Sequence, residues 1–414
     1  MSSEPRPPVE HEVPTVTLAD IEAARAAQQG LVIRTPMEDS RWLSERVGAP
    51  VLLKCENLQR TGSFKIRGAI TRMARLSAAE RDAGVVAASA GNHAQGVALA
   101  AQQLGIKATV FMPMGASIPK EKATRGYGAQ VRVVGHSVDE ALLSAQEYAA
   151  QTGAVLIHPF DHTDIVAGQG TCGLEILEQC PAMRTVLVSL GGGGLLAGIA
   201  TAVKAVRPDV RVVGVQAEHA AAYPDSLAAG APKPTTDLAT MADGIAVGCP
   251  GAVPFAAVQR HVDDVVTVSE EALSSALLML LERAKMVVEP AGAAGVAALL
   301  DDPGGYDGPV VVVLSGGNID PLLLMAVIRH GMAAAGRYLS FRVRIPDRPG
   351  ALASLLGQLA EVEANVLDVV HQRTSAALHL DEVDVAVQVE TRGPEHCDAV
   401  LAHVRGAGYP VTFP

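Results

Sequence analysis

The chain has 414 residues, with 33 Lys and Arg against 44 Asp and Glu and a formal net charge of −11 at pH 7. At about 150 residues per domain, this length predicts two or three domains with an ample core. The negative charge disfavours nucleic acid as a partner because phosphodiester backbones are repelled. Aromatic residues make up 3% of a chain that is 49% hydrophobic and contains 40 Gly. This composition favours small-residue α/β packing over an all-β sandwich.

The start of the chain predicts a disordered tail over residues 1–14, because it is polar and rich in Pro. It lacks the charged segment and apolar core of a signal peptide. No uninterrupted apolar run reaches the roughly 18 residues that span a bilayer. The 5 cysteines are scattered and odd in number, as expected of reduced thiols. We therefore expect a cytoplasmic protein with no membrane partner.

Residues 15–330 show the pattern of layered α/β structure. A helix is expected from Val16, and Arg34-Thr35-Pro36 ends it. Three later segments each combine an apolar strand, a turn rich in Gly and Ser, and a helix of small residues, which is typical of parallel strands. Strands are expected at 51–54, 85–87, 107–112, 130–134, 185–188, 210–215 and 310–314. This order predicts a doubly wound, two-lobed body whose smaller lobe covers about 55–158.

The composition changes at 331–336, where small residues precede a new alternating pattern, and we place a linker at 331–337. The alternation predicts a half-buried strand from Tyr338, followed by a turn at 347–350. The remaining elements are expected as a helix at 351–361, strands at 366–372 and 383–389, a helix at 395–405 and a strand near 411. This βαββαβ order predicts a ferredoxin-like domain over 338–414.

Lys65 is the first candidate for chemistry, because it lies between Phe64 and Ile66 at an expected helix start. A lone lysine there is more often a surface residue whose stem packs on apolar neighbours. Four consecutive glycines at 191–194, between a strand and a helix, change that balance because their N–H groups can hold a phosphate. Pyridoxal 5′-phosphate needs both features, since it carries a phosphate and binds a lysine covalently.

A dinucleotide site is an alternative for the same glycines. It would need G-x-G-x-x-G with an acidic residue about 20 positions later, and the strand at 210–215 is followed by Gln216. Asn92 and Ser315 follow two other expected strands, where Asn and Ser often serve only the local turn. Because parallel strand ends meet in one crevice, we expect these turns to lie close together.

The motifs resemble the fold-type II (tryptophan synthase β-like) pyridoxal-phosphate enzymes, and among them the threonine ammonia-lyases. The segment 63–69 resembles the cofactor-lysine motif, 89–96 the substrate-carboxylate loop, 191–195 the phosphate loop and 315–318 the motif at the pyridine nitrogen. The resemblance covers about residues 16–330. The C-terminal βαββαβ segment resembles an ACT domain, a regulatory module that binds small ligands, often amino acids, commonly at a turn such as 347–350.

The resemblance implies a role for each matched residue. Lys65 would be the catalytic residue, which binds the cofactor covalently and then takes the Cα proton of the substrate. Asn92 would contact the ring hydroxyl and Ser315 the ring nitrogen. The implied cofactor-binding set is Phe64, Lys65, Asn92, Gly191, Gly192, Gly193, Gly194, Leu195 and Ser315. The implied substrate-binding set is Ser89, Ala90, Gly91, Asn92 and His93.

The implied reaction is elimination from L-threonine to 2-oxobutanoate and ammonia, with L-serine as a second substrate that gives pyruvate. A serine hydroxyl at the ring nitrogen carries no charge to hold a proton there, which favours elimination over transamination. An amino-acid effector at the ACT-like domain and a homodimer or homotetramer are further expectations.

Two other functions remain open on the sequence. A serine racemase or serine dehydratase has the same fold, but a racemase needs an acid/base residue where this chain has Ala90. Racemase-like relatives also place metal-binding carboxylates where Gln216 and Ala222 stand, so we expect no divalent metal. The second alternative is a non-catalytic amino-acid sensor, which the intact Lys65, Asn92 and Ser315 disfavour.

Overall fold

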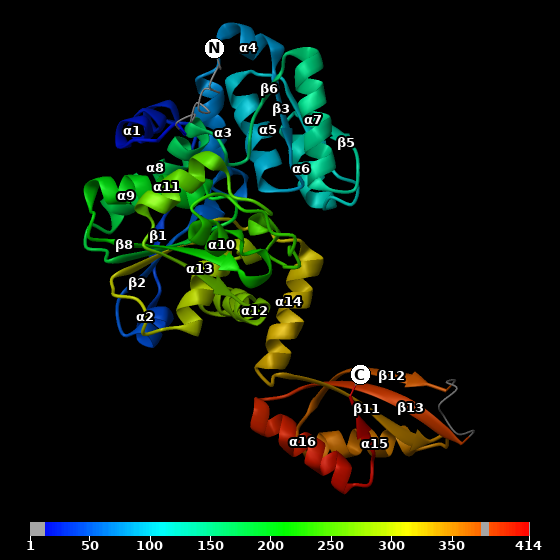
Figure 1. Cartoon of the computed structure of the whole chain (residues 1–414). Helices are drawn as coiled ribbons and strands as arrows, with labels where there is room; N and C mark the ends of the chain where they lie inside the picture. Colours follow the sequence, from blue (N-terminus) through cyan, green and yellow to red (C-terminus); the bar gives the residue numbers. More distant parts are fainter. Residues whose placement is uncertain (1–12, 374–380, 414) are drawn as a thin grey trace, which may run out of the picture. The chain divides into compact units, whose positions relative to one another are not determined.

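A computed structural model describes residues 13–373 and 381–413. The chain forms two compact units, which divide between Asp320 and Pro321 and which we call unit 1 and unit 2 (Figure 1). Apart from Val13 and Pro14, the expected tail lies outside the described residues. The division comes earlier than the expected boundary at 330, and helix α14 (Pro321–Ala334) continues into the expected linker. The small residues that suggested a linker include Ala, which is the best helix former.

The larger lobe of unit 1 contains a six-stranded sheet in the order β1-β2-β10-β7-β8-β9. All neighbouring strands are parallel except β1 and β2. The strands are β1 (Met37–Asp39), β2 (Val51–Lys54), β7 (Thr185–Ser189), β8 (Arg211–Ala217), β9 (Asp264–Val268) and β10 (Val310–Val313). The helices are α1 (Leu18–Ala27), α2 (Arg41–Val47), α8 (Thr163–Gln179), α9 (Gly194–Val206), α10 (Ala222–Ala229), α11 (Ala252–His261), α12 (Glu270–Met279) and α13 (Pro290–Asp301). Short helical turns are η1 (Glu56–Leu58), η2 (Arg60–Gly62), η3 (Glu218–Ala220), η4 (Asp243–Ile245) and η5 (Leu280–Ala284).

The smaller lobe contains a four-stranded parallel sheet in the order β5-β4-β3-β6. Its strands are β3 (Val85–Ala88), β4 (Ala108–Met112), β5 (Gln130–Val133) and β6 (Val155–Leu156). Its helices are α3 (Lys65–Ala74), α4 (Ala78–Ala83), α5 (Asn92–Leu104), α6 (Ile118–Gly126) and α7 (Val138–Thr152). Figure 1 shows these elements gathered in one part of unit 1. The expected two-lobed α/β body is therefore confirmed.

Small residues allow close packing in unit 1. Every residue of β10 is a fully buried valine, as expected for a parallel strand covered on both faces. Helices α8 and α9 cross so closely that a Cβ on Gly198 would lie 2.4 Å from the carbonyl oxygen of Val166. The Gly and Ala content of the chain thus serves helix contact as well as turns. No helix among the described residues is long and apolar enough to cross a membrane.

Unit 2 has an antiparallel sheet in the order β12-β13-β11-β14. Its elements after α14 are β11 (Tyr338–Pro346), α15 (Ala351–Glu361), β12 (Asn365–Gln372), β13 (Glu382–Glu390), α16 (Pro394–Gly406) and β14 (Val411–Thr412). Alternate side chains of β11 and β13, such as Phe341 and Val385, are buried with Leu355 and Val400 of the helices. This βαββαβ chain order confirms the expected ferredoxin-like fold.

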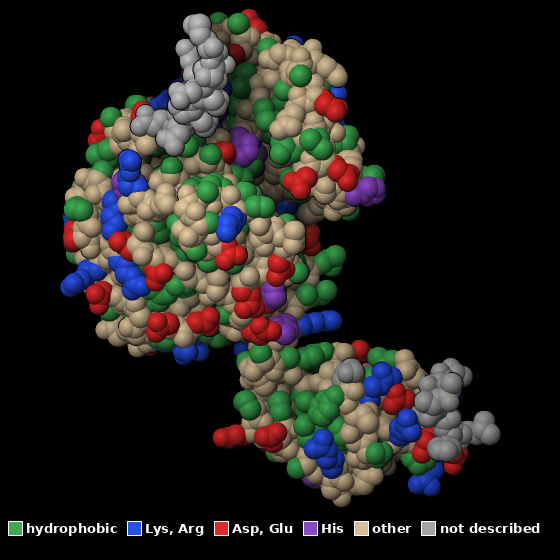
Figure 2. Space-filling model, viewed as in Figure 1, with side chains coloured by type: hydrophobic (Ala, Val, Ile, Leu, Met, Phe, Trp, Pro, Cys, Tyr) green, Lys and Arg blue, Asp and Glu red, His purple; other side chains and the backbone are tan. Residues whose placement is uncertain are grey.

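The surface of unit 1 is hollowed beside the smaller lobe, as the space-filling view shows (Figure 2). Lys, Arg, Asp and Glu side chains are interspersed on the face of the molecule seen there. Mixed charge of this kind is typical of a solvated protein surface.

Candidate active site

The residues predicted from the sequence meet in one cavity of about 890 Å³ in unit 1. It lies where β3, β7 and β10 end, so the turns after these strands form much of its wall. The lining includes every candidate site residue: Phe64, Lys65, Ser89, Ala90, Gly91, Asn92, His93, Gly191, Gly192, Gly193, Gly194, Leu195 and Ser315. Strand topology thus brings together segments that are separated by up to 251 positions in sequence (64 and 315).

Lys65 is held in place by the turn that follows β10. The N–H of Phe64 donates to the carbonyl oxygen of Ser315 at 3.2 Å, and the N–H of Gly317 donates to Gly62 at 2.8 Å. Ser63 also forms a β-bridge with Gly316. The lysine at the start of α3 and the serine at the end of β10 therefore share one backbone framework.

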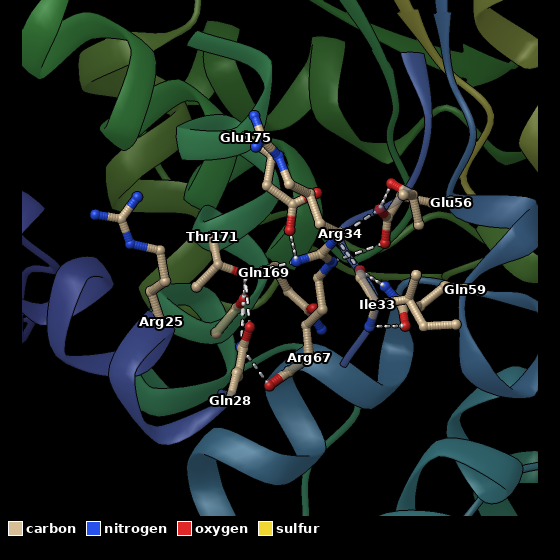
Figure 3. Close-up of polar contacts among 12 residues, drawn as sticks. Arg25, Gln28, Ile33, Arg34, Glu56, Gln59, Arg67, Gln169, Thr171 and Glu175 are labelled. Atoms are coloured by element: carbon tan, nitrogen blue, oxygen red, sulfur yellow. Dashed lines mark hydrogen bonds and ion pairs between the residues drawn. The ribbon is translucent and has the colours of Figure 1, made fainter. Parts of the chain in front are cut away.

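A buried ion network anchors the first turn of α3 (Figure 3). Arg67 is fully buried and donates two hydrogen bonds to Glu56, at 2.7 and 2.8 Å, and one to Glu175 at 2.8 Å. Lys54 pairs with the second oxygen of Glu175 at 2.6 Å. The bidentate pairing of Arg67 with Glu56 fixes the orientation of the two side chains as well as compensating their charges. Arg67 thus restrains the helix end that carries Lys65.

The surroundings of Lys65 favour a neutral amine. Burial lowers the pKa of Lys65 to about 8, although the nearby Glu289 carboxylate acts in the opposite direction. Lys65 Nζ donates a hydrogen bond to the carbonyl oxygen of Pro159 at 3.3 Å and lies 5.2 Å from the centre of the Phe64 ring. A lysine with this lowered pKa can act as a nucleophile or a base near neutral pH.

The loop 191–194 leaves no room for side chains. A Cβ on Gly192 would lie 2.4 Å from the Phe160 ring, and one on Gly193, where φ is +97°, would lie 1.9 Å from Tyr223 Oη. Helix α9 begins at Gly194, the last glycine of this loop. Backbone N–H groups at such a helix start bind anions, above all phosphate.

Asn92 is fixed by two hydrogen bonds from other elements. Its Nδ2 donates to Glu289 Oε1 at 2.6 Å, and its Oδ1 accepts from Asn318 Nδ2 at 2.8 Å. Asn318 also donates to the carbonyl oxygen of Thr61 at 2.6 Å. The second amide hydrogen of Asn92 stays available for a ligand that enters the cavity.

Ser315 is buried at the end of β10, and its hydroxyl accepts a hydrogen bond from Ser189 Oγ at 2.9 Å. The hydroxyl proton of Ser315 is then free to be donated into the cavity. Ser189 is the last residue of β7, so the two adjacent strands place their terminal hydroxyl groups together.

The turn 89–93 offers backbone rather than side-chain groups. Ser89 Oγ accepts from the N–H of Gly91 at 3.1 Å, and α5 begins at Asn92. The His93 ring is bound to the carbonyl oxygen of Ile157 at 2.7 Å, and burial lowers the pKa of His93 to about 3. The ring is therefore neutral and engaged in the protein, which leaves the backbone of His93 for a ligand.

Comparison with known proteins places this cavity in a family. The sequence matches the model described as pyridoxal-phosphate dependent enzyme over residues 29–316. The chain belongs to the pyridoxal-phosphate-dependent enzymes. The cofactor expected from the sequence is thereby confirmed.

Individual relatives include ammonia-lyases and a racemase. The L-threonine ammonia-lyase of Thermotoga maritima is 45% identical over 396 residues, which are 96% of this chain and 99% of that protein. The crystal structure of a threonine deaminase from T.th. is 43% identical with a TM-score of 0.70, covering 73% of this chain and 99% of that one. Maize serine racemase is 34% identical with a TM-score of 0.73, covering 78% of this chain and 99% of that one.

The cavity of this pyridoxal-phosphate-dependent enzyme fits its cofactor. The glycine loop at 191–194 is a cradle that only backbone can line, which suits the phosphate. Lys65 and Ser315 line the same cavity, where Lys65 would supply the amine for covalent attachment and Ser315 a neutral hydroxyl for the ring nitrogen. The second amide hydrogen of Asn92 would serve the ring hydroxyl.

Glu289 is not among the site residues expected from the sequence, although the structure places it in the cavity wall beside Asn92. Its side chain is buried, and Glu289 Oε2 has no hydrogen-bond partner among the described residues. Burial raises the pKa of Glu289 to about 7, with a further contribution from Asp243. In the sequence, Glu289 stands out only as an acidic residue between two valines and Pro290. An acidic residue at that position is also typical of a helix start.

Proposed function

We propose that this enzyme is a threonine ammonia-lyase, which eliminates water from L-threonine and releases 2-oxobutanoate and ammonia. The observation that carries the proposal is the placement of Lys65, with its lowered pKa, in one cavity with the glycine loop and the neutral Ser315 hydroxyl. The similarity to threonine ammonia-lyase over nearly the whole chain supports the same reaction. L-serine, which lacks only the methyl group, is a second substrate.

In this proposal the cofactor, when bound, holds the substrate amine covalently and withdraws electrons from the Cα–H bond. Lys65 would act as the neutral base that takes the Cα proton of the substrate. The turn 89–93 orients the substrate carboxylate through backbone N–H groups at the start of α5. Ser315 would face the ring nitrogen with a neutral hydroxyl, which supplies no charge to hold a proton there and so favours elimination over transamination.

Serine racemisation is the second candidate, because maize serine racemase has a similar structure. Ala90 supports elimination, since it lines the cavity and has no group that can return a proton to Cα. Incubation with L-serine separates the two reactions: we expect pyruvate and no D-serine. D-serine as the main product would overturn the lyase proposal. Ala90→Ser is expected to add D-serine formation.

Unit 2 is proposed as an ACT-like regulatory domain that binds an amino-acid effector at the turn 347–350. Its ferredoxin-like order of strands supports this, as does its separate core. Equilibrium dialysis of the full chain against isoleucine and valine tests the effector. Binding of isoleucine with loss of activity indicates a role in isoleucine synthesis. If isoleucine and valine leave the activity unchanged, a role in threonine breakdown is favoured and the regulatory proposal is refuted.

The enzyme is further proposed to work as a homodimer or homotetramer in the cytoplasm. All five cysteines are free, three of them buried and Cys249 exposed, which agrees with a reducing compartment. Sedimentation of the purified protein gives the oligomeric state, and a monomer that is fully active would refute the oligomer.

The direct test of the reaction is product analysis with purified protein, pyridoxal phosphate and L-threonine. We expect 2-oxobutanoate and ammonia in equal amounts. An absence of both products, with the cofactor visibly bound, would refute the proposed function while leaving the family assignment intact.

A further inference from the structure

An amino-acid substrate brings a carboxylate into a cavity whose lining already contains three acidic side chains. The carboxylates among the lining residues are Asp139, Asp243 and Glu289. The phosphate of the cofactor adds to this charge. The Lys and Arg residues among the described lining residues are Lys65 and Lys120. Since Lys65 serves the cofactor, Lys120 is the cation left for the substrate.

Lys120 occupies a suitable position next to the turn 89–93. It lies near the start of α6 and is only 9% exposed. Its Nζ atom would be 3.9 Å from a Cβ placed on Gly91, so it faces the turn whose N–H groups are proposed to bind the substrate carboxylate. A charged donor and backbone donors that converge on one point form a carboxylate site.

The present partner of Lys120 is replaceable. Lys120 Nζ forms an ion pair with Asp243 at 2.8 Å, and the Asp243 side chain is 61% exposed while that of Lys120 is 11% exposed. A buried ammonium needs a counter-charge, but an exposed carboxylate loses little when it returns to water. Asp243 lies on η4 of the larger lobe, whereas Lys120 belongs to the smaller lobe.

We propose that Lys120 binds the carboxylate of the amino-acid substrate and that Asp243 pairs with it when the substrate is absent. This inference rests on the proposed function, which makes the substrate an amino acid. Substrate entry then exchanges one carboxylate for another at the same ammonium. The exchange keeps the buried charge of Lys120 compensated at each stage.

A pair of unreactive ligands tests the role of Lys120 in the full-length enzyme loaded with cofactor. L-alanine has the α-amine and the carboxylate but no β-hydroxyl to eliminate, and L-alaninamide lacks the negative charge. Binding of each is measured from the change in cofactor absorbance. We expect Lys120→Met to weaken alanine binding about 10- to 150-fold, the range for a charge-assisted hydrogen bond. Alaninamide binding should change less than about threefold, because its neutral amide gains little from an ammonium.

Lys122→Met is the matched control, because Lys122 lies on the same helix but its side chain is less buried. It should bind both ligands like the wild type. Equal losses for alanine and alaninamide in Lys120→Met would show a merely structural role and overturn the proposal, and so would unchanged alanine binding. A wild-type enzyme that does not bind alanine at all would also overturn it.

Asp243→Asn tests the exchange itself. Removal of the competing carboxylate should raise the affinity for alanine a few-fold and leave that for alaninamide unchanged. A fall in alanine affinity would refute the exchange. The proposed reaction is judged separately: an enzyme that binds alanine through Lys120 but makes no 2-oxobutanoate from threonine would refute only the reaction.

Discussion

Asn92 and Glu289 are joined by a hydrogen bond of 2.6 Å, although they are 197 positions apart in the chain. Asn92 begins α5 in the smaller lobe, and Glu289 directly precedes α13 in the larger lobe. The bond fixes the amide that faces the cavity to a carboxyl group that burial makes hard to ionise. Its strength and the local stability therefore depend on the protonation of Glu289.

Glu289→Gln should make the cofactor-free chain less sensitive to pH. The pKa of Glu289 is raised to about 7, above the roughly 4.3 expected in the unfolded chain. Its stabilising contribution is thus fully present below the unfolded pKa and is lost as pH rises through about 7. The variant should be more stable than the wild type at pH 8, by up to about 3 kcal/mol, and similar at pH 4.

Fluorescence of Trp42 in α2, the single tryptophan of the chain, reports unfolding of unit 1. Urea unfolding followed at this residue checks the prediction across the pH range. A stability difference between the wild type and Glu289→Gln that does not change from pH 4 to pH 8 would contradict the raised pKa.

Gly193→Ala should weaken cofactor binding by at least about tenfold, because the loop must shift and its N–H groups lose their alignment for the phosphate. A Cβ there would lie 1.9 Å from Tyr223 Oη, and the φ of +97° is unfavourable for alanine. Gly230→Ala is the control, because φ is +70° there but no atom lies within 4 Å. Absorbance titration with pyridoxal phosphate compares the cofactor affinities of the two variants. Equal affinities would refute the role of the glycine loop in binding the phosphate.

Arg67→Met should destabilise unit 1 by about 3–5 kcal/mol, because it leaves the buried Glu56 carboxylate without its main partner. Burial alone would raise the pKa of Glu56, but Arg67 overcomes this and holds it below its usual value. Arg125→Met removes an exposed pair with Glu121 and should cost less than about 1 kcal/mol. Urea unfolding followed by Trp42 fluorescence measures the free energy of unfolding of both variants. Similar losses of stability would mean that the buried network contributes no more than an exposed ion pair.

Attachment of the cofactor to Lys65 should accelerate as the pH rises and level off above about 8. Burial lowers the pKa of Lys65 to about 8, and only the neutral amine forms the covalent bond. Stopped-flow absorbance of the cofactor-free enzyme mixed with pyridoxal phosphate gives the rate. A rate that keeps rising up to about pH 10, as for an exposed lysine, would contradict the lowered pKa.

Much of the site was predictable because three of the four motifs, those at 89–96, 191–195 and 315–318, follow closely after a strand. The segments before Ser315 and Gly191 are buried apolar runs, and parallel topology brings their ends together. Glu289, Lys120 and Asp243 were not predictable in the same way. Their roles depend on burial and on pairing between lobes, and an isolated Glu, Lys or Asp in a sequence is more often on the surface.

The boundary between the units was misplaced for a related reason. The residues 331–335 are Gly-Met-Ala-Ala-Ala, which resemble a linker in composition but extend α14 as far as Ala334. Intrinsic helix propensity decided the structure there. In unit 2 the alternation of apolar and polar residues from Tyr338 was strong enough to predict a half-buried strand, which the structure shows as β11.

The most direct test of the account is the release of 2-oxobutanoate from L-threonine by the wild-type enzyme and by Lys65→Ala, each saturated with pyridoxal phosphate. The wild type should release the oxo acid, and Lys65→Ala should be slower by about 10²–10⁴-fold, the usual contribution of a positioned base. If both proteins retain the cofactor, the lower rate of Lys65→Ala reflects the loss of a reaction step and not the loss of cofactor binding. Comparable rates for the two proteins would contradict the central role of Lys65.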